Sequence, residues 1–141
     1  MTQPLDLAAL EARVEAATEG SRELDALIWG VIQGLTAVGL TMTLGGSEEL
    51  RTPRGEELRF PEHPWPGNYT TSVDAALALI ERVLPGARCM VEREFDGRSW
   101  AMIQPGIAAP REQIDGATPA IALCAAALRA LQAKQTGADH A

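Results

Sequence analysis

Lysine is nearly absent from this sequence, and histidine, cysteine and aromatic residues are scarce. Lys134 is the single lysine among 12 basic residues, and 19 acidic residues bring the formal net charge to −7. A surface with this charge repels the phosphate backbone of nucleic acids. Nucleic-acid binding is therefore the function that the composition favours least.

The few cysteines and histidines also limit the chemistry. Cys89 and Cys124 show no C-x-x-C spacing, and with His63 and His140 they do not complete a zinc site. Each cysteine falls on an apolar face of an expected element, which predicts buried free thiols, as in a reducing cytosol. We expect no metal and no cofactor.

Long apolar runs are missing as well. No stretch approaches the ~20 residues with which a helix spans a bilayer. The N-terminal sequence MTQPLDLAAL lacks the basic and apolar regions of a signal peptide. We therefore expect a cytoplasmic protein without membrane association, in the host cytoplasm if a phage encodes it.

Catalytic motifs are absent too. The chain has no G-x-S-x-G, no P-loop and no G-x-G-x-x-G after a strand. The neighbouring carboxylates Glu48–Glu49 and Glu56–Glu57 resemble solvated charge rather than an acid–base pair, and His63 resembles a solvated loop residue. We expect no enzyme and assign no catalytic residue.

The remaining composition is that of a globular domain. With 141 residues, of which 46% are hydrophobic, the chain is long enough to bury a core, and we expect one domain over 1–132 with a flexible tail over 133–141. Apolar residues at helical spacing predict helices over 7–17, 22–35, 73–84 and 119–132. Their start signals are Ser21, Thr71 or Ser72, and Thr118 followed by Pro119.

Alternating residues predict strands between these helices. Residues 38–44 alternate, and two charged segments around Pro53 suggest a hairpin within 48–60. A clearer hairpin covers 88–104, where Asp96-Gly97 predicts a two-residue type I′ turn. That turn places Arg93, Arg98 and Trp100 on one face. Residues 106–117 are a loop or an edge segment. The fold class is α+β, a small antiparallel sheet between helical layers.

Three prolines stiffen the loop over 61–68, which precedes the third helix. We expect this loop to hold Trp65 beside Tyr69 at the helix start. Two outcomes stay open, an aromatic pair that sandwiches a base or a loop fixed by burial of its aromatic residues.

Two helix starts carry a family resemblance. The chain resembles the phage α-β-α sandwich domain family over about 69–131, and residues 19–28 match more weakly. The matching positions are Tyr69, Thr70, Ser72, Val73, Asp74, Ala75 and Ala76, then Thr118, Pro119, Ala120, Ala122 and Leu123. Val73 stands where the family usually has leucine, and 38–60 do not align. The resemblance implies a sheet between helical layers and a phage setting, and it brings no catalytic residues.

Candidate ligand-binding residues gather at these helix starts and on the hairpin. Free N–H groups at a helix start suit an anion, although ordinary capping explains the same residues. An arginine beside an indole could hold a phosphate or form a cation–π pair that supports the sheet. The candidate ligand-binding residues are Trp65, Tyr69, Thr70, Thr71, Ser72, Arg93, Arg98, Trp100 and Thr118.

Two functions follow as hypotheses. The first is a non-enzymatic, phage-encoded protein that sequesters a small anionic ligand, with a nucleotide immune signal as the candidate. The second is a protein-interaction module, an inhibitor or a phage assembly factor, that acts through an acidic surface around Glu48, Glu49, Glu56 and Glu57. Alanine-rich helix faces with Gly30 and Gly34 favour self-association, as a homodimer or a higher homo-oligomer.

Overall fold

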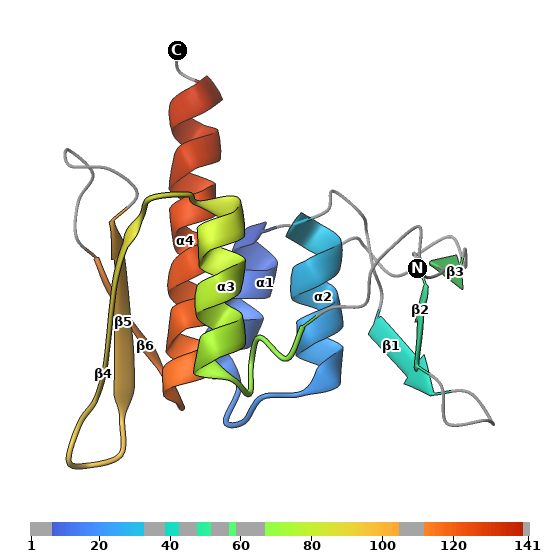
Figure 1. The fold of residues 1–141 in the computed structure, drawn as a ribbon, viewed down its shortest axis with the longest axis horizontal. Helices are drawn as coiled ribbons and strands as arrows, with labels where there is room; N and C mark the ends of the chain where they lie inside the picture. The colour runs from blue at the N-terminus through green and yellow to red at the C-terminus, as the bar shows by residue number, and fades with distance from the viewer. Residues whose placement is uncertain are drawn as a thin grey trace.

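The structure is a computed structural model that describes residues 7–32, 39–42, 48–51, 57–58, 67–104 and 112–139. The α+β class and the packing of a three-stranded antiparallel sheet against helices are confirmed. The elements in chain order are α1 (Leu7–Ala16), α2 (Arg22–Ile32), β1 (Gly39–Met42), β2 (Glu48–Arg51), β3 (Glu57–Leu58), α3 (Val73–Val83), β4 (Arg88–Arg93), β5 (Ser99–Gln104), β6 (Gln113–Gly116) and α4 (Pro119–Asp139) (Figure 1).

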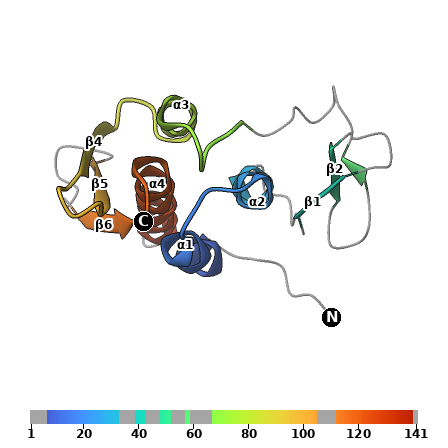
Figure 2. The same ribbon diagram turned by 90° about the horizontal axis from the view of Figure 1, so that it is seen from below.

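The helices lie between two small antiparallel sheets. One sheet has the order β4-β5-β6, and the other has the order β1-β2-β3. The end-on view shows α1, α3 and α4 next to the first sheet and α2 toward the second (Figure 2). Over the described residues, no helix combines the length and the apolar character that crossing a membrane requires.

Helix α4 is the centre of the core. Every residue from Ala120 to Leu128 is buried, and the helix packs on α1 and α3 and across β5 and β6. Alanine side chains allow this close approach on several sides. The alanines of α4 from Ala120 to Ala130 are buried, and so is Gly30, so they offer no surface for self-association. Gly34 lies outside the described residues, and the homo-oligomer stays a prediction.

The predicted helix caps are present. The hydroxyl oxygen of Ser72 accepts from the N–H of Ala75 at 3.2 Å, and that of Thr118 accepts from Ile121 at 3.2 Å. Gly86, with φ of 78°, follows the end of α3. Each cap satisfies an N–H group that the helix itself leaves unpaired.

The C-terminal helix is longer than predicted. We expected a flexible tail over 133–141, but α4 continues to Asp139. Alanine, glutamine and lysine are good helix formers, so they extend the helix past its buried part.

The turn of the β4–β5 hairpin differs from the prediction. The N–H of Gly97 donates to the carbonyl of Glu94 at 3.0 Å, and the N–H of Glu94 donates to the carbonyl of Arg98 at 2.7 Å. These bonds enclose a three-residue loop in which Gly97, at φ of 91°, takes the left-handed position of a G1 bulge. The predicted two-residue type I′ turn is wrong, because that turn needs a positive φ at Asp96 as well, and Asp96 has none.

The longer turn shifts the strand register by one residue. Arg93 pairs with Ser99, and Glu92 pairs with Trp100. Since side chains alternate along a strand, this shift moves every β5 side chain to the face opposite the predicted one. Ala101 and Ile103 therefore face α4 and are buried, whereas Trp100 lies on the outer face.

Candidate functional site

The structure divides the candidate ligand residues among separate places. Tyr69, Thr70, Thr71 and Ser72 precede α3, Thr118 precedes α4, and Arg93, Arg98 and Trp100 belong to the hairpin. Trp65 lies outside the described residues, and so do most of the stiff loop and Glu56 of the acidic surface.

Thr70 is a structural residue at the junction of α2 and α3. It is 1% exposed, and its hydroxyl donates to Oδ1 of Asp25 at 2.7 Å. Its backbone N–H donates to the same oxygen at 2.9 Å. The N–H of Ser21 donates to the Thr70 hydroxyl at 3.0 Å. The segment Tyr69-Thr70 is thus tied to the start of α2, which explains these residue types without a ligand.

Tyr69 belongs to the core. It is 8% exposed, and the thiol of the buried Cys124 donates to its carbonyl at 3.2 Å. Burial raises the pKa of the Cys124 thiol to about 12, so this thiol stays protonated. For Tyr69, burial within the fold is the outcome that the structure shows.

The predicted one-face cluster of Arg93, Arg98 and Trp100 is wrong. The register places Arg93 on the face toward α4 and Trp100 on the outer face. Arg98 lies in the exposed turn, where its Nε bonds to Oδ2 of Asp96 at 2.8 Å. Hydrogen bonds from Arg98 hold the pKa of Asp96 below its usual value. An indole and a guanidinium on opposite faces cannot hold one ligand.

The structure brings Arg93 and the start of α4 to the same end of the sheet. Arg93, Ser99 and Gly116 form one row across the three strands, and Thr118 follows two residues later. A Cβ atom on Gly116 would lie 2.6 Å from the backbone nitrogen of Ala122, so sheet and helix are in direct contact there. Among the described residues the buried Ser99 hydroxyl has no hydrogen-bond partner, but the packing of Gly116 on Ala122 leaves no space for a ligand there.

Sequence reasoning missed the free edge of β4. Strand β4 pairs with β5 on one side, and within the described residues no strand pairs with its other side. Cys89, expected to be buried, is exposed, because α4 packs mainly across β5 and β6 and covers little of β4. An apolar face in the sequence did not reveal that this strand lies at an edge.

The main-chain groups at this edge alternate in direction. The bond from Glu94 to Arg98 marks a hydrogen-bonded pair, so the pairs Glu92–Trp100 and Met90–Met102 are hydrogen-bonded pairs too. The N–H and C=O groups of Cys89, Val91 and Arg93 therefore point away from β5. These three residues form a row of main-chain donors and acceptors along the free edge of the six-residue strand β4.

A groove runs beside this edge, under α3. It has a volume of about 310 Å³, and Leu77 on its α3 wall is a large apolar side chain with 38% exposure. In Figure 2, α3 lies toward the β4 side of the sheet. The groove is lined by Leu77, Ile80, Glu81, Leu84, Gly86, Ala87 and Cys89.

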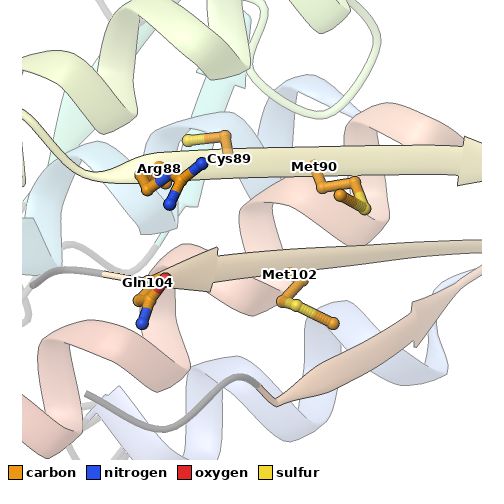
Figure 3. Close-up of a pocket in the computed structure, with 5 residues that line it drawn as sticks. All are labelled: Arg88, Cys89, Met90, Met102 and Gln104. Atoms are coloured by element: carbon orange, nitrogen blue, oxygen red, sulfur yellow. The ribbon is translucent and has the colours of Figure 1, made fainter. Parts of the chain in front are cut away.

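A second depression lies where β4 and β5 adjoin. Figure 3 shows Arg88 and Met90 of β4 beside Gln104 and Met102 of β5. Its volume of about 120 Å³ is well below the ~300–1,000 Å³ of typical small-molecule sites. The depression can accept single side chains of a partner and is too small to enclose a nucleotide.

An ionic cluster around Arg129 joins α1 to α4. Arg129 bonds to both carboxylate oxygens of Glu11 at 2.6 and 2.9 Å and to Glu112 at 2.6 Å. Burial acts to raise the pKa of Glu11, but the hydrogen bonds with Arg129, Glu15 and Gln132 and the positive charge of Arg129 together outweigh it and lower that pKa. The part of the chain that the structure describes contains no group of three or more acidic, histidine or cysteine side chains placed to hold a metal.

Comparison with known proteins adds no relative. No family model, no curated protein and no solved structure matches this chain.

Proposed function

We propose that this protein is a non-enzymatic protein-interaction module that binds an extended segment of another polypeptide along β4, under α3. The observation that carries the proposal is the free edge of β4 with an apolar groove beside it. A segment added at such an edge forms main-chain hydrogen bonds, and its alternate side chains enter neighbouring pockets.

The exposure of β4 supports this use. Five of its six residues are exposed, and Met90 is 56% exposed. A long free edge favours uncontrolled pairing between chains, so proteins commonly protect it or use it for a specific partner. Here the side of the edge toward the core has an apolar groove, which a bound segment would fill.

The geometry favours this hypothesis over sequestration of a nucleotide signal. Thr70, Ser72 and Thr118 are engaged in hydrogen bonds within the fold, and Tyr69 is buried. Sequestration of a small anion, the phage setting and the acidic surface stay predictions. The proposed surface differs from the acidic surface because it is a strand edge that carries basic and acidic side chains, among them Arg88 and Glu92.

A proline at Val91 tests the proposal. Because the N–H of Val91 points away from β5, proline removes a donor for an added strand and leaves the β4–β5 ladder intact. A library of short random peptides selected on the natural protein should yield sequences that also bind Val91→Ala and do not bind Val91→Pro. Cys89→Pro, with the same N–H direction, provides a second variant if Val91→Pro is unstable. A library without binders, or binders that keep their affinity for the proline variants, would contradict the proposal.

A further inference from the structure

The side chains of β4 specify the segment that this edge accepts. We infer that the bound segment runs antiparallel to β4, with a carboxylate opposite Arg88, a cation opposite Glu92 and an apolar residue opposite Cys89. The inference rests on the proposed function and adds the chemistry of the partner to it.

The register of the added strand follows from the free main-chain groups. Cys89 and Val91 point their N–H and C=O groups outward, so they form the hydrogen-bonded pairs with the new strand. Arg88, Met90 and Glu92 then occupy non-hydrogen-bonded pairs. In such pairs the Cα atoms are closer, ~4.5 Å apart, so the side chains on this face contact their partners most directly.

The outer face of β4 carries opposite charges around an apolar centre. Arg88 and Glu92 flank Met90, and within the described part of the chain neither charged residue forms an ion pair. Opposite charges placed directly across two strands stabilise their pairing, and like charges oppose it. The charge order of the edge therefore selects one charge order in the partner.

The inner face sets the polarity of the residue opposite Cys89. That residue lies on the same side as Cys89 and enters the groove under α3. Leu77 and Leu84 supply apolar walls there, and Glu81 also lines the groove. An apolar side chain such as valine suits these walls, whereas an acidic residue would lie near the Glu81 carboxylate.

Antiparallel direction converts these preferences into an order along the partner. Antiparallel ladders are slightly more stable per residue than parallel ladders. Read from its N-terminus, the segment has a basic residue, any residue, two apolar residues and an acidic residue. These lie opposite Glu92, Val91, Met90, Cys89 and Arg88, respectively.

Two synthetic peptides with exchanged charges test the inference. The matched peptide has the order lysine, threonine, leucine, valine, aspartate, and the swapped peptide exchanges its lysine and aspartate. We expect the natural protein to bind the matched peptide ~10-fold more tightly, since both cross-strand pairs change from attraction to repulsion in the swapped peptide. The Arg88→Glu/Glu92→Lys double variant should reverse the preference, and Arg88→Gln should reduce it.

The outcomes separate this inference from the proposed function. Equal affinity for both peptides, with loss of binding in Val91→Pro, overturns the inferred chemistry and leaves the strand-binding function standing. A preference for the swapped peptide overturns the antiparallel direction. If neither peptide binds the natural protein, the inference fails, and the library selection decides the proposed function independently.

Discussion

The hydroxyl of Thr70 donates a hydrogen bond of 2.7 Å to Oδ1 of Asp25, a residue 45 positions earlier in the chain. Both side chains are buried, and Arg22 lies 3.2 Å from the other carboxylate oxygen of Asp25. The contact joins the start of α2 to the segment before α3. Thr70 therefore contributes to stability, whereas its position in the sequence suggested a ligand contact.

Replacement of Thr70 by valine should destabilise the protein. Valine has nearly the same shape but removes the hydroxyl donor to the buried Asp25 carboxylate and leaves the Ser21 N–H without its acceptor. The expected loss is ~1–3 kcal/mol in the free energy of unfolding, measured by urea denaturation. Thr71→Val, at an exposed position, is the control and should change stability little. A loss below ~0.5 kcal/mol in Thr70→Val would contradict the structural role.

Gly20 and Gly86 should respond to alanine for different reasons. A Cβ atom on Gly20 would lie 2.2 Å from the carbonyl oxygen of Thr70, so the backbone must move. We expect a loss above ~2 kcal/mol for Gly20→Ala. No described atom lies within 4 Å of a Cβ added at Gly86. Its φ is +78°, however, and this left-handed conformation costs alanine ~1 kcal/mol. Thermal unfolding of the two variants should show the larger shift for Gly20→Ala, and the reverse order would contradict this packing.

The Glu11–Arg129 pair should make stability depend on pH. Because the pKa of Glu11 is lowered from its ordinary value of 4.5 in the folded protein, the pair stabilises the fold above that pH. Its contribution is lost as the pH falls through the folded pKa. Arg129→Met should cost ~1–3 kcal/mol at neutral pH, since it leaves the buried carboxylate unpaired. The free energies of unfolding of the natural protein and of Arg129→Met, measured by urea denaturation, should become equal at acidic pH.

Glu112→Gln is the matched control for that pair. Glu112 also contacts Arg129, at 2.6 Å, but its side chain is exposed. Its removal should change the free energy of unfolding by less than ~1 kcal/mol. An effect of Arg129→Met that is independent of pH between neutral and acid conditions would contradict the role of the Glu11 carboxylate.

The two thiols should differ in reactivity. Cys89 is exposed, whereas Cys124 is buried with a pKa raised to about 12. A thiol reagent at mildly alkaline pH should label Cys89 in the native protein and both cysteines in denaturant. Cys89 is exposed as a residue, but partial burial of its thiol and the nearby Glu81 carboxylate raise the pKa of this thiol as well. Its labelling should therefore be slower than that of free cysteine. Mass spectrometry identifies the labelled residue, and native labelling of Cys124 would contradict the core packing.

The strand-pairing register illustrates the limit of local sequence reasoning. Asp96-Gly97 is a typical two-residue turn, and the hairpin itself was predicted correctly. The loop includes Phe95 as a third residue, and this change moved Trp100 away from Arg93. A single inserted residue reverses the faces of a strand because side chains alternate with a period of two. Arg93 and Trp100 therefore lie on opposite faces of the sheet, although the hairpin that carries them was predicted.

The sequence by itself determined where α3 and α4 begin and where α3 ends. The caps at Ser72 and Thr118, the stop at Gly86 and the helical spacing of apolar residues act within a few positions, so they can be read locally. Only the tertiary structure decided that Thr70 bonds to Asp25 and that β4 is an edge strand beside α3. These relationships depend on which distant segments pack together, and the pattern along one segment does not contain that information.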